Sequence, residues 1–139
     1  MRRACALALA MTLSSFVAAG DPQADARTAA EDGKLLYSIY CTGCHGAEAR
    51  GDGPAAASMQ PPPADLTRLS AGNDGTFPRA RVILSIDGRT RIPGHIKGDM
   101  PIWGLSLRDP GSDADQEREV GAKILKLVAY PESIQPKSD

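Results

Sequence analysis

This chain has 139 residues, enough for one small domain, and its 16 Lys and Arg against 17 Asp and Glu give a formal charge of −1. These values exclude a multidomain enzyme, a transmembrane bundle, a coiled coil and a protein that binds nucleic acid by bulk charge. With only 4% aromatic residues, 14 Gly and 11 Pro, side chains alone supply a thin core, so we expect another apolar group to complete it.

The first residues have the order of an export signal. Two arginines follow the initial Met, an apolar stretch runs from Ala4 to about Ala19, and small residues precede a polar segment. We predict a signal peptide over residues 1–19, cleaved after Ala19 or alternatively after Gly20, and a periplasmic mature chain of residues 20–139. A retained membrane anchor is disfavoured, because so short a stretch, interrupted by polar residues, barely spans about 30 Å of hydrocarbon.

The mature chain is predicted to begin with a flexible segment, residues 21–27, followed by a helix over residues 28–41. Its apolar residues recur at helical spacing, and acidic residues stand early, where the helix dipole favours them. Gly33 within this helix costs about 1 kcal/mol relative to Ala. That cost predicts that a second helix approaches closely at Gly33.

Cys41, Cys44 and His45 form a Cys-x-x-Cys-His pattern, which is typical of covalent attachment of c-type haem. In a helical turn each thiol can add to one vinyl group of the same porphyrin, and the adjacent histidine can bind its iron as the proximal ligand. Three alternatives are weaker. A thioredoxin-like pair lacks that fold's strand pattern, and a disulfide rarely closes so short a loop. Zinc would need four ligands, and besides the two cysteines only His45 and His95 are candidates.

The middle of the chain favours short helices and long loops. Residues 45–63 are rich in Gly and Pro and are predicted to form a wrapped loop with one turn at residues 55–59. A short helix is predicted over residues 79–86, closed by Asp87 and Gly88. The prediction is therefore an all-α fold of three to four short helices wrapped around one haem, with an ordered core at about residues 28–130.

The last helix is predicted to pair with the first. Ser112 and Asp115 offer an N-cap, Pro131 is expected to end the helix, and Gly121 is expected to make room for the partner helix. One apolar stripe runs along it, formed by Val120, Ile124, Leu127 and Val128.

The sixth ligand of the iron is predicted to be Met100. Because a proline follows it, this residue is biased toward an extended conformation that can aim its side chain inward, and Trp103 offers a large ring to seal the pocket. Met59 stands close after His45, from where the opposite face of the ring is awkward to reach, and its simpler interpretation is core packing. His95 remains an alternative ligand, or else an exposed residue or a partner of a haem propionate, and a lysine is a weaker candidate.

Four motifs lie within residues 28–130. They are Tyr40-Cys41-x-x-Cys44-His45-Gly46, Gly51-x-Gly53-Pro54, Pro62-Pro63-Ala64-Asp65-Leu66-Thr67 and Gly98-Asp99-Met100-Pro101-Ile102-Trp103-Gly104. Together they resemble a class I cytochrome c, most closely the small bacterial periplasmic ones related to the cytochrome c subunits of cbb3-type oxidases. The resemblance implies that Met100 is the distal ligand and that the carbonyl of Pro54 accepts the Nδ1–H of His45. It also implies that Gly33 and Tyr37 pack against the last helix.

The predicted ligand set indicates an electron carrier rather than an enzyme. A soft thioether opposite a histidine favours Fe(II), and burial of the haem raises the potential further. The sequence suggests no general acid, nucleophile or open coordination position, so we expect one-electron transfer between redox partner proteins of a respiratory or dehydrogenase chain. The alternatives are a cytochrome subunit of a larger oxidoreductase complex and a haem sensor or peroxidase with a labile sixth ligand.

Charge is segregated along the second half of the chain. Residues 79–97 hold five basic residues and one acid, whereas residues 98–119 hold six acids and two arginines. One hypothesis is a positive docking face, including Arg89 and Arg91, that steers an acidic redox partner. The other is that these side chains neutralise haem propionates or are simply solvated.

Overall fold

A computed structural model describes residues 21–90, 98–111 and 113–136. Within these residues there are three short 3₁₀ turns and no strand. The same ranges contain five α-helices: α1 (Pro22–Tyr40), α2 (Thr42–His45), α3 (Arg79–Asp87), α4 (Trp103–Ser106) and α5 (Ala114–Ser133). The predicted all-α fold is confirmed, and so are the short helix closed by a left-handed Gly88 and the single turn after His45, which spans Ala56–Ser58.

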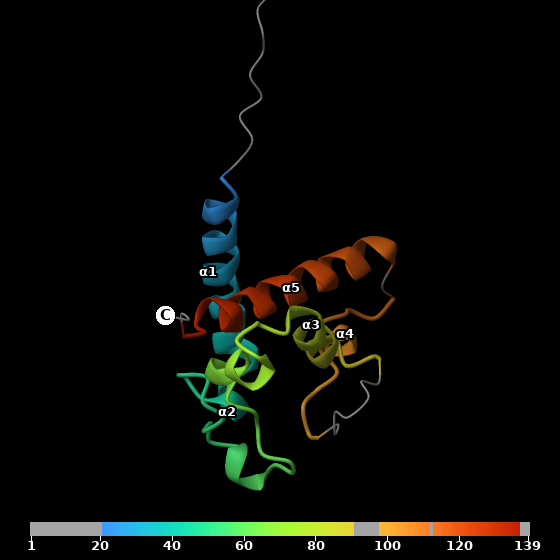
Figure 1. Ribbon diagram of the computed structural model, residues 1–139. Helices are drawn as coiled ribbons and strands as arrows, with labels where there is room; N and C mark the ends of the chain where they lie inside the picture. Colours follow the sequence, from blue (N-terminus) through green and yellow to red (C-terminus); the bar gives the residue numbers. More distant parts are fainter. Residues whose placement is uncertain (1–20, 91–97, 112, 137–139) are drawn as a thin grey trace, which may run out of the picture.

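Helices α1 and α5 cross and form the largest contact between elements (Figure 1). Helix α3 packs against α5 and α4, while α2 and the loop after it continue below the end of α1. The predicted stripe of α5 is buried in two clusters. Leu127 joins Tyr37 and Tyr130 at the crossing, whereas the rest of the stripe faces α3.

The crossing depends on Gly33, as the sequence predicts. A Cβ atom at this position would lie 2.0 Å from the carbonyl oxygen of Lys126, so only a hydrogen fits between the backbones. One turn further along, the rings of Tyr37 and Tyr130 are 4.9 Å apart between centroids. The prediction for Gly121 is wrong, because a Cβ placed there would have no atom of another described element within 4 Å.

The ends of the two long helices differ from the prediction. Helix α1 begins at Pro22 rather than at residue 28, because the Asp21 side chain accepts a hydrogen bond from the Gln23 N–H at 2.9 Å and caps a proline-led first turn. Helix α5 is capped by Asp113, whose side chain accepts from the N–H groups of Asp115 and Gln116, and it continues past Pro131 to Ser133. A proline therefore stands in its last turn without ending it.

Some predictions concern residues outside those described. The signal peptide of residues 1–19, His95, Arg91 and Ser112 all lie there. Among the described residues, no helix has both the length and the apolar character needed to cross a membrane.

Candidate haem-binding site

The cysteine and histidine residues lie where α1 gives way to α2. The Cys41 N–H still donates to the carbonyl of Tyr37 at 2.9 Å, and the His45 N–H donates to the carbonyl of Cys41 at 2.8 Å. Gly46, with φ of +80°, then turns the chain away. Cys41 and Cys44 are half-buried free thiols. The single helical turn thus groups two thiols and one imidazole, as the spacing predicts.

The ring of His45 is oriented by a backbone carbonyl, but not by the predicted one. Its Nδ1 lies 3.0 Å from the carbonyl oxygen of Ala64. Because that oxygen only accepts, Nδ1 carries the proton and Nε2 is left free for a metal ion. The prediction that the carbonyl of Pro54 has this role is wrong, since the loop places the carbonyl of Ala64 at Nδ1 instead.

Burial changes the protonation of these groups. Desolvation lowers the pKa of His45, although the hydrogen bond to Ala64 opposes the shift, so the imidazole is held in the neutral form that binds iron. Desolvation, with a smaller contribution from Cys44, raises the pKa of Cys41 to about 12. A thioredoxin-like pair needs a lowered thiol pKa, so this shift argues against that alternative.

The same turn forms one wall of a cavity of about 360 Å³. This volume lies within the range of small-molecule and cofactor sites. Both candidate methionines, Met59 and Met100, reach it from separate loops, and Trp103 closes it beside Tyr40, with ring centroids 5.2 Å apart. The remaining lining residues are Cys41, Cys44, His45, Pro61, Pro62, Pro63, Ala64, Gly98, Asp99 and Pro101.

These residues fit a covalently held haem. The cavity brings together two free thiols, an imidazole with Nε2 available and two thioether sulfurs, among walls of Pro, Tyr and Trp. Cys41 and Cys44 would hold the porphyrin, and His45 would bind its iron. In the described part of the chain, no group of three or more His, Cys, Asp or Glu residues could hold another metal ion.

The fold and the site therefore define a helical protein that binds haem through a Cys-x-x-Cys-His turn. A family model described as Cytochrome c matches residues 30–103, more than half of the chain, and the chain belongs to the cytochrome c family. Membership implies a covalent c-type haem and, in general for the family, electron transfer. No curated protein and no solved structure matches the chain.

Two features of the site were not predicted from the sequence. Ala64 acts through its backbone, so its side chain gives no signal. The hydroxyl of Tyr37 is the second, because the resemblance places this residue only against the last helix. In the structure, the Tyr37 O–H donates to the buried carbonyl of Gly46, and burial is the main reason that the pKa of Tyr37 is raised.

We expect Tyr37→Phe to lower the free energy of unfolding by about 1–2 kcal/mol, because the Gly46 carbonyl loses its donor while it stays buried. Thermal unfolding of the haem-containing protein measures the loss. Tyr40→Phe is the matched control, since Tyr40 is 37% exposed and its hydroxyl can be solvated; its effect should stay below about 0.5 kcal/mol. Equal losses in the two variants would contradict the role given to the Tyr37 hydroxyl.

Proposed function

We propose that this protein is an exported, monohaem electron carrier of the class I type, with His45 and Met100 as axial ligands. In this proposal it resembles the small cytochromes related to cbb3-type oxidase subunits. It works in the periplasm and passes single electrons between redox partner proteins of a respiratory or dehydrogenase chain. The observation that carries the proposal is one cavity lined by both His45 and Met100, together with the two thiols.

Each of these residues has one task. Cys41 and Cys44 would hold the ring through thioether bonds, and Nε2 of His45 and the sulfur of Met100 would bind the iron. When bound, haem supplies an iron that changes oxidation state by one electron. If both His45 and Met100 bind the iron, no position would remain on it for a substrate, which favours electron transfer over catalysis. Trp103 and Tyr40 would form an aromatic wall beside the haem.

Absorption spectra of protein made with a haem-maturation system test this proposal, with a haem assay to count one haem per chain. We expect sharp reduced α and β bands and a weak far-red sulfur-to-iron band in the oxidised form. A c-type spectrum without the far-red band, joined to rapid CO binding by the reduced protein, would instead favour a sensor or peroxidase. Absence of covalent haem would overturn the proposal.

Location and partners have separate tests. Periplasmic recovery of a chain that begins at residue 20 or 21 would support export and cleavage after Ala19 or Gly20. Recovery as a single free protein would support a diffusing carrier. Stoichiometric co-purification with a large partner would instead identify a subunit of an oxidoreductase complex.

A further inference from the structure

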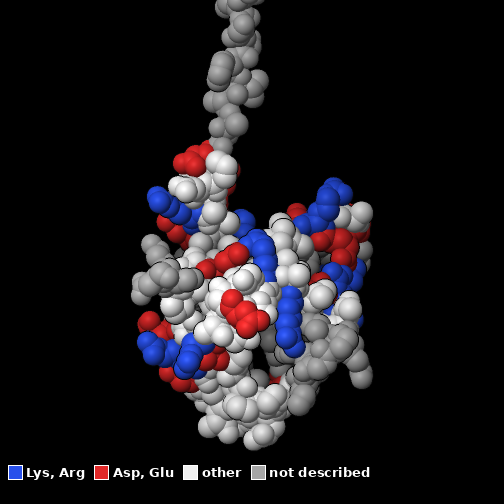
Figure 2. Space-filling model, in the orientation of Figure 1, with Lys and Arg blue, Asp and Glu red and all other residues white. Residues whose placement is uncertain are grey.

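Two of the three basic side chains of residues 79–90 are paired within the molecule. Arg79 forms an ion pair with Glu132, and Arg89 forms ion pairs with Asp87 and Glu117. Figure 2 shows basic and acidic side chains intermixed on the face in view rather than a continuous basic surface. The guanidinium of Arg89 is therefore used in contacts within the molecule, which disfavours a role in steering a redox partner.

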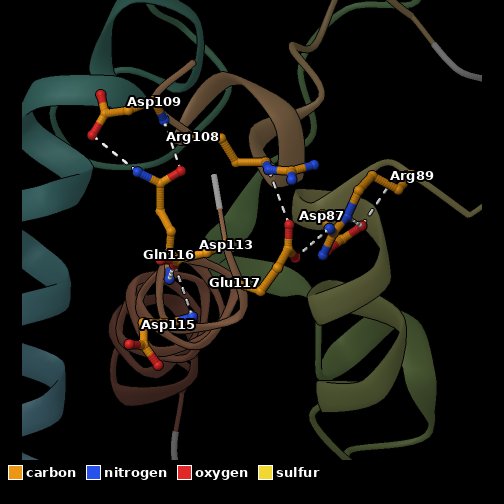
Figure 3. Close-up of polar contacts among 8 residues, drawn as sticks. All are labelled: Asp87, Arg89, Arg108, Asp109, Asp113, Asp115, Gln116 and Glu117. Carbon is orange, nitrogen blue, oxygen red and sulfur yellow. Dashed lines mark hydrogen bonds and ion pairs between the residues drawn. The ribbon is translucent and has the colours of Figure 1, made fainter. Parts of the chain in front are cut away.

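Arg89 stands at the centre of a network that joins three parts of the fold (Figure 3). Its guanidinium lies 2.7 Å from Asp87 at the end of α3 and 2.8 Å from Glu117 in the first turns of α5. The other oxygen of Glu117 lies 2.9 Å from Arg108, which follows α4. Hydrogen bonds from Arg89 lower the pKa of both carboxyl groups, so both are charged at neutral pH.

A second pair of hydrogen bonds ties the segment after α4 to α5. The Asp109 N–H donates to the side-chain oxygen of Gln116, and the Gln116 amide donates back to the Asp109 carboxylate, both at 3.1 Å. Asp113 caps α5 in the same place (Figure 3). The chain leaving α4 is therefore fixed to α5 through both Arg108 and Asp109.

The network also contacts the backbone of α4. Gly104 is buried, and a Cβ atom placed there would lie 2.5 Å from Nε of Arg89 and 2.9 Å from Cγ of Asp87. The Arg89–Asp87 pair thus lies directly on the α4 backbone. Next to it, a Cβ at Gly88 would lie 3.2 Å from Cα of Ile102. These contacts hold Ile102 and Gly104, which follow Met100 in the chain, against the end of α3.

The segment before Met100 has a different support. Gly98 lies against Pro61, with 2.9 Å between the position of its Cβ and Cδ of the proline. Met100 and Trp103 stand between this contact and the network, and both line the cavity. Arg89 and Glu117 are each about one-third exposed, so their ion pairs contribute little stability on their own. The planar guanidinium of Arg89 instead fixes an orientation, because it holds the carboxylates of Asp87 and Glu117 in a defined geometry beside Gly104.

We propose that Arg89 is a positioning residue for the distal side of the haem: with Asp87 and Glu117 it holds the Met100–Gly104 segment so that the Met100 sulfur stays at the iron. The inference rests on the proposed His45 and Met100 ligation. When the network is lost, the sulfur of Met100 is away from the iron in a larger fraction of the molecules. External ligands then reach that position more easily.

The test compares Arg89→Gln with Arg79→Gln in the haem-containing protein. Arg79 is a matched control, since it also forms a partly exposed ion pair between α3 and α5 but lies at the opposite end of α3. We expect Arg89→Gln to speed CO binding to the reduced protein and imidazole binding to the oxidised protein by about ten-fold, equal to about 1.4 kcal/mol. Its far-red band should weaken, while Arg79→Gln should leave all three unchanged.

Three results would overturn the inference. They are unchanged ligand binding in Arg89→Gln, an equal effect of Arg79→Gln, and a far-red band missing from the unsubstituted protein. The last would also overturn the proposed ligation, whereas the first two leave it standing. If Arg89→Gln does not fold, Glu117→Ala removes the same link from α5 and should give the same direction of change. Arg89→Lys keeps the charge without the planar guanidinium and should rescue only part of the effect.

Discussion

Met100→Ala should abolish the far-red sulfur-to-iron band while covalent haem is retained. In the proposed site the thioether bonds come from Cys41 and Cys44, so attachment should not depend on Met100. The reduction potential should fall, because loss of the soft thioether removes a ligand that favours Fe(II). The reduced variant should also bind CO rapidly. Spectra of both oxidation states, a redox titration and CO mixing measure the three effects.

Met59→Ala is the control for this experiment. Met59 lines the same cavity, and its removal takes away a similar apolar volume from another loop. We expect it to retain the far-red band and slow CO binding, with at most a loss of stability. The opposite pattern, in which Met59→Ala loses the band and Met100→Ala keeps it, would make Met59 the distal ligand. A band that survives in both variants would mean that either methionine can replace the other at the iron.

The helices that position the site can be predicted from the sequence where the spacing of apolar side chains determines their position. The stripe of Val120, Ile124, Leu127 and Val128 is buried as its spacing predicts. The extension of α1 to Pro22 was missed because residues 22–28 are exposed and carry no stripe. That turn depends on an N-cap at Asp21, which is a local hydrogen bond rather than a packing pattern. Pro131 marked the region where α5 ends but not its last residue.

The candidate site also has a part that the sequence predicts and a part that it does not. Its chemistry is carried by side chains, so Cys41, Cys44, His45 and Met100 could be chosen from the sequence, and the structure brings all four to one cavity. Its orientation is carried by backbone and by distant partners. Ala64 reaches His45 only because the long loop returns to α2, a path that the sequence pattern does not encode. The pairing of Arg89 with Glu117 depends equally on how α3 meets α5.

Gly33→Ala should be among the most destabilising single substitutions in this protein. A Cβ at this position lies 2.0 Å from the carbonyl oxygen and 2.8 Å from the carbonyl carbon of Lys126, both backbone atoms, and 3.2 Å from Cβ of Tyr130. Helices α1 and α5 would have to separate, and this separation would disturb the contact between the rings of Tyr37 and Tyr130. We expect a loss of about 3 kcal/mol or more in the free energy of unfolding.

Gly121→Ala provides the matched comparison, because it makes the same chemical change in α5 at a position where no atom of another described element lies within 4 Å of the new Cβ. There the greater helix propensity of Ala should raise the free energy of unfolding by about 0.5–1 kcal/mol. The same substitution is thus expected to act with opposite signs at the two positions. Thermal and denaturant unfolding of the haem-containing protein measure both values. Because propensity alone would stabilise both variants, a Gly33→Ala protein as stable as the unsubstituted one would contradict the close contact of α1 with α5.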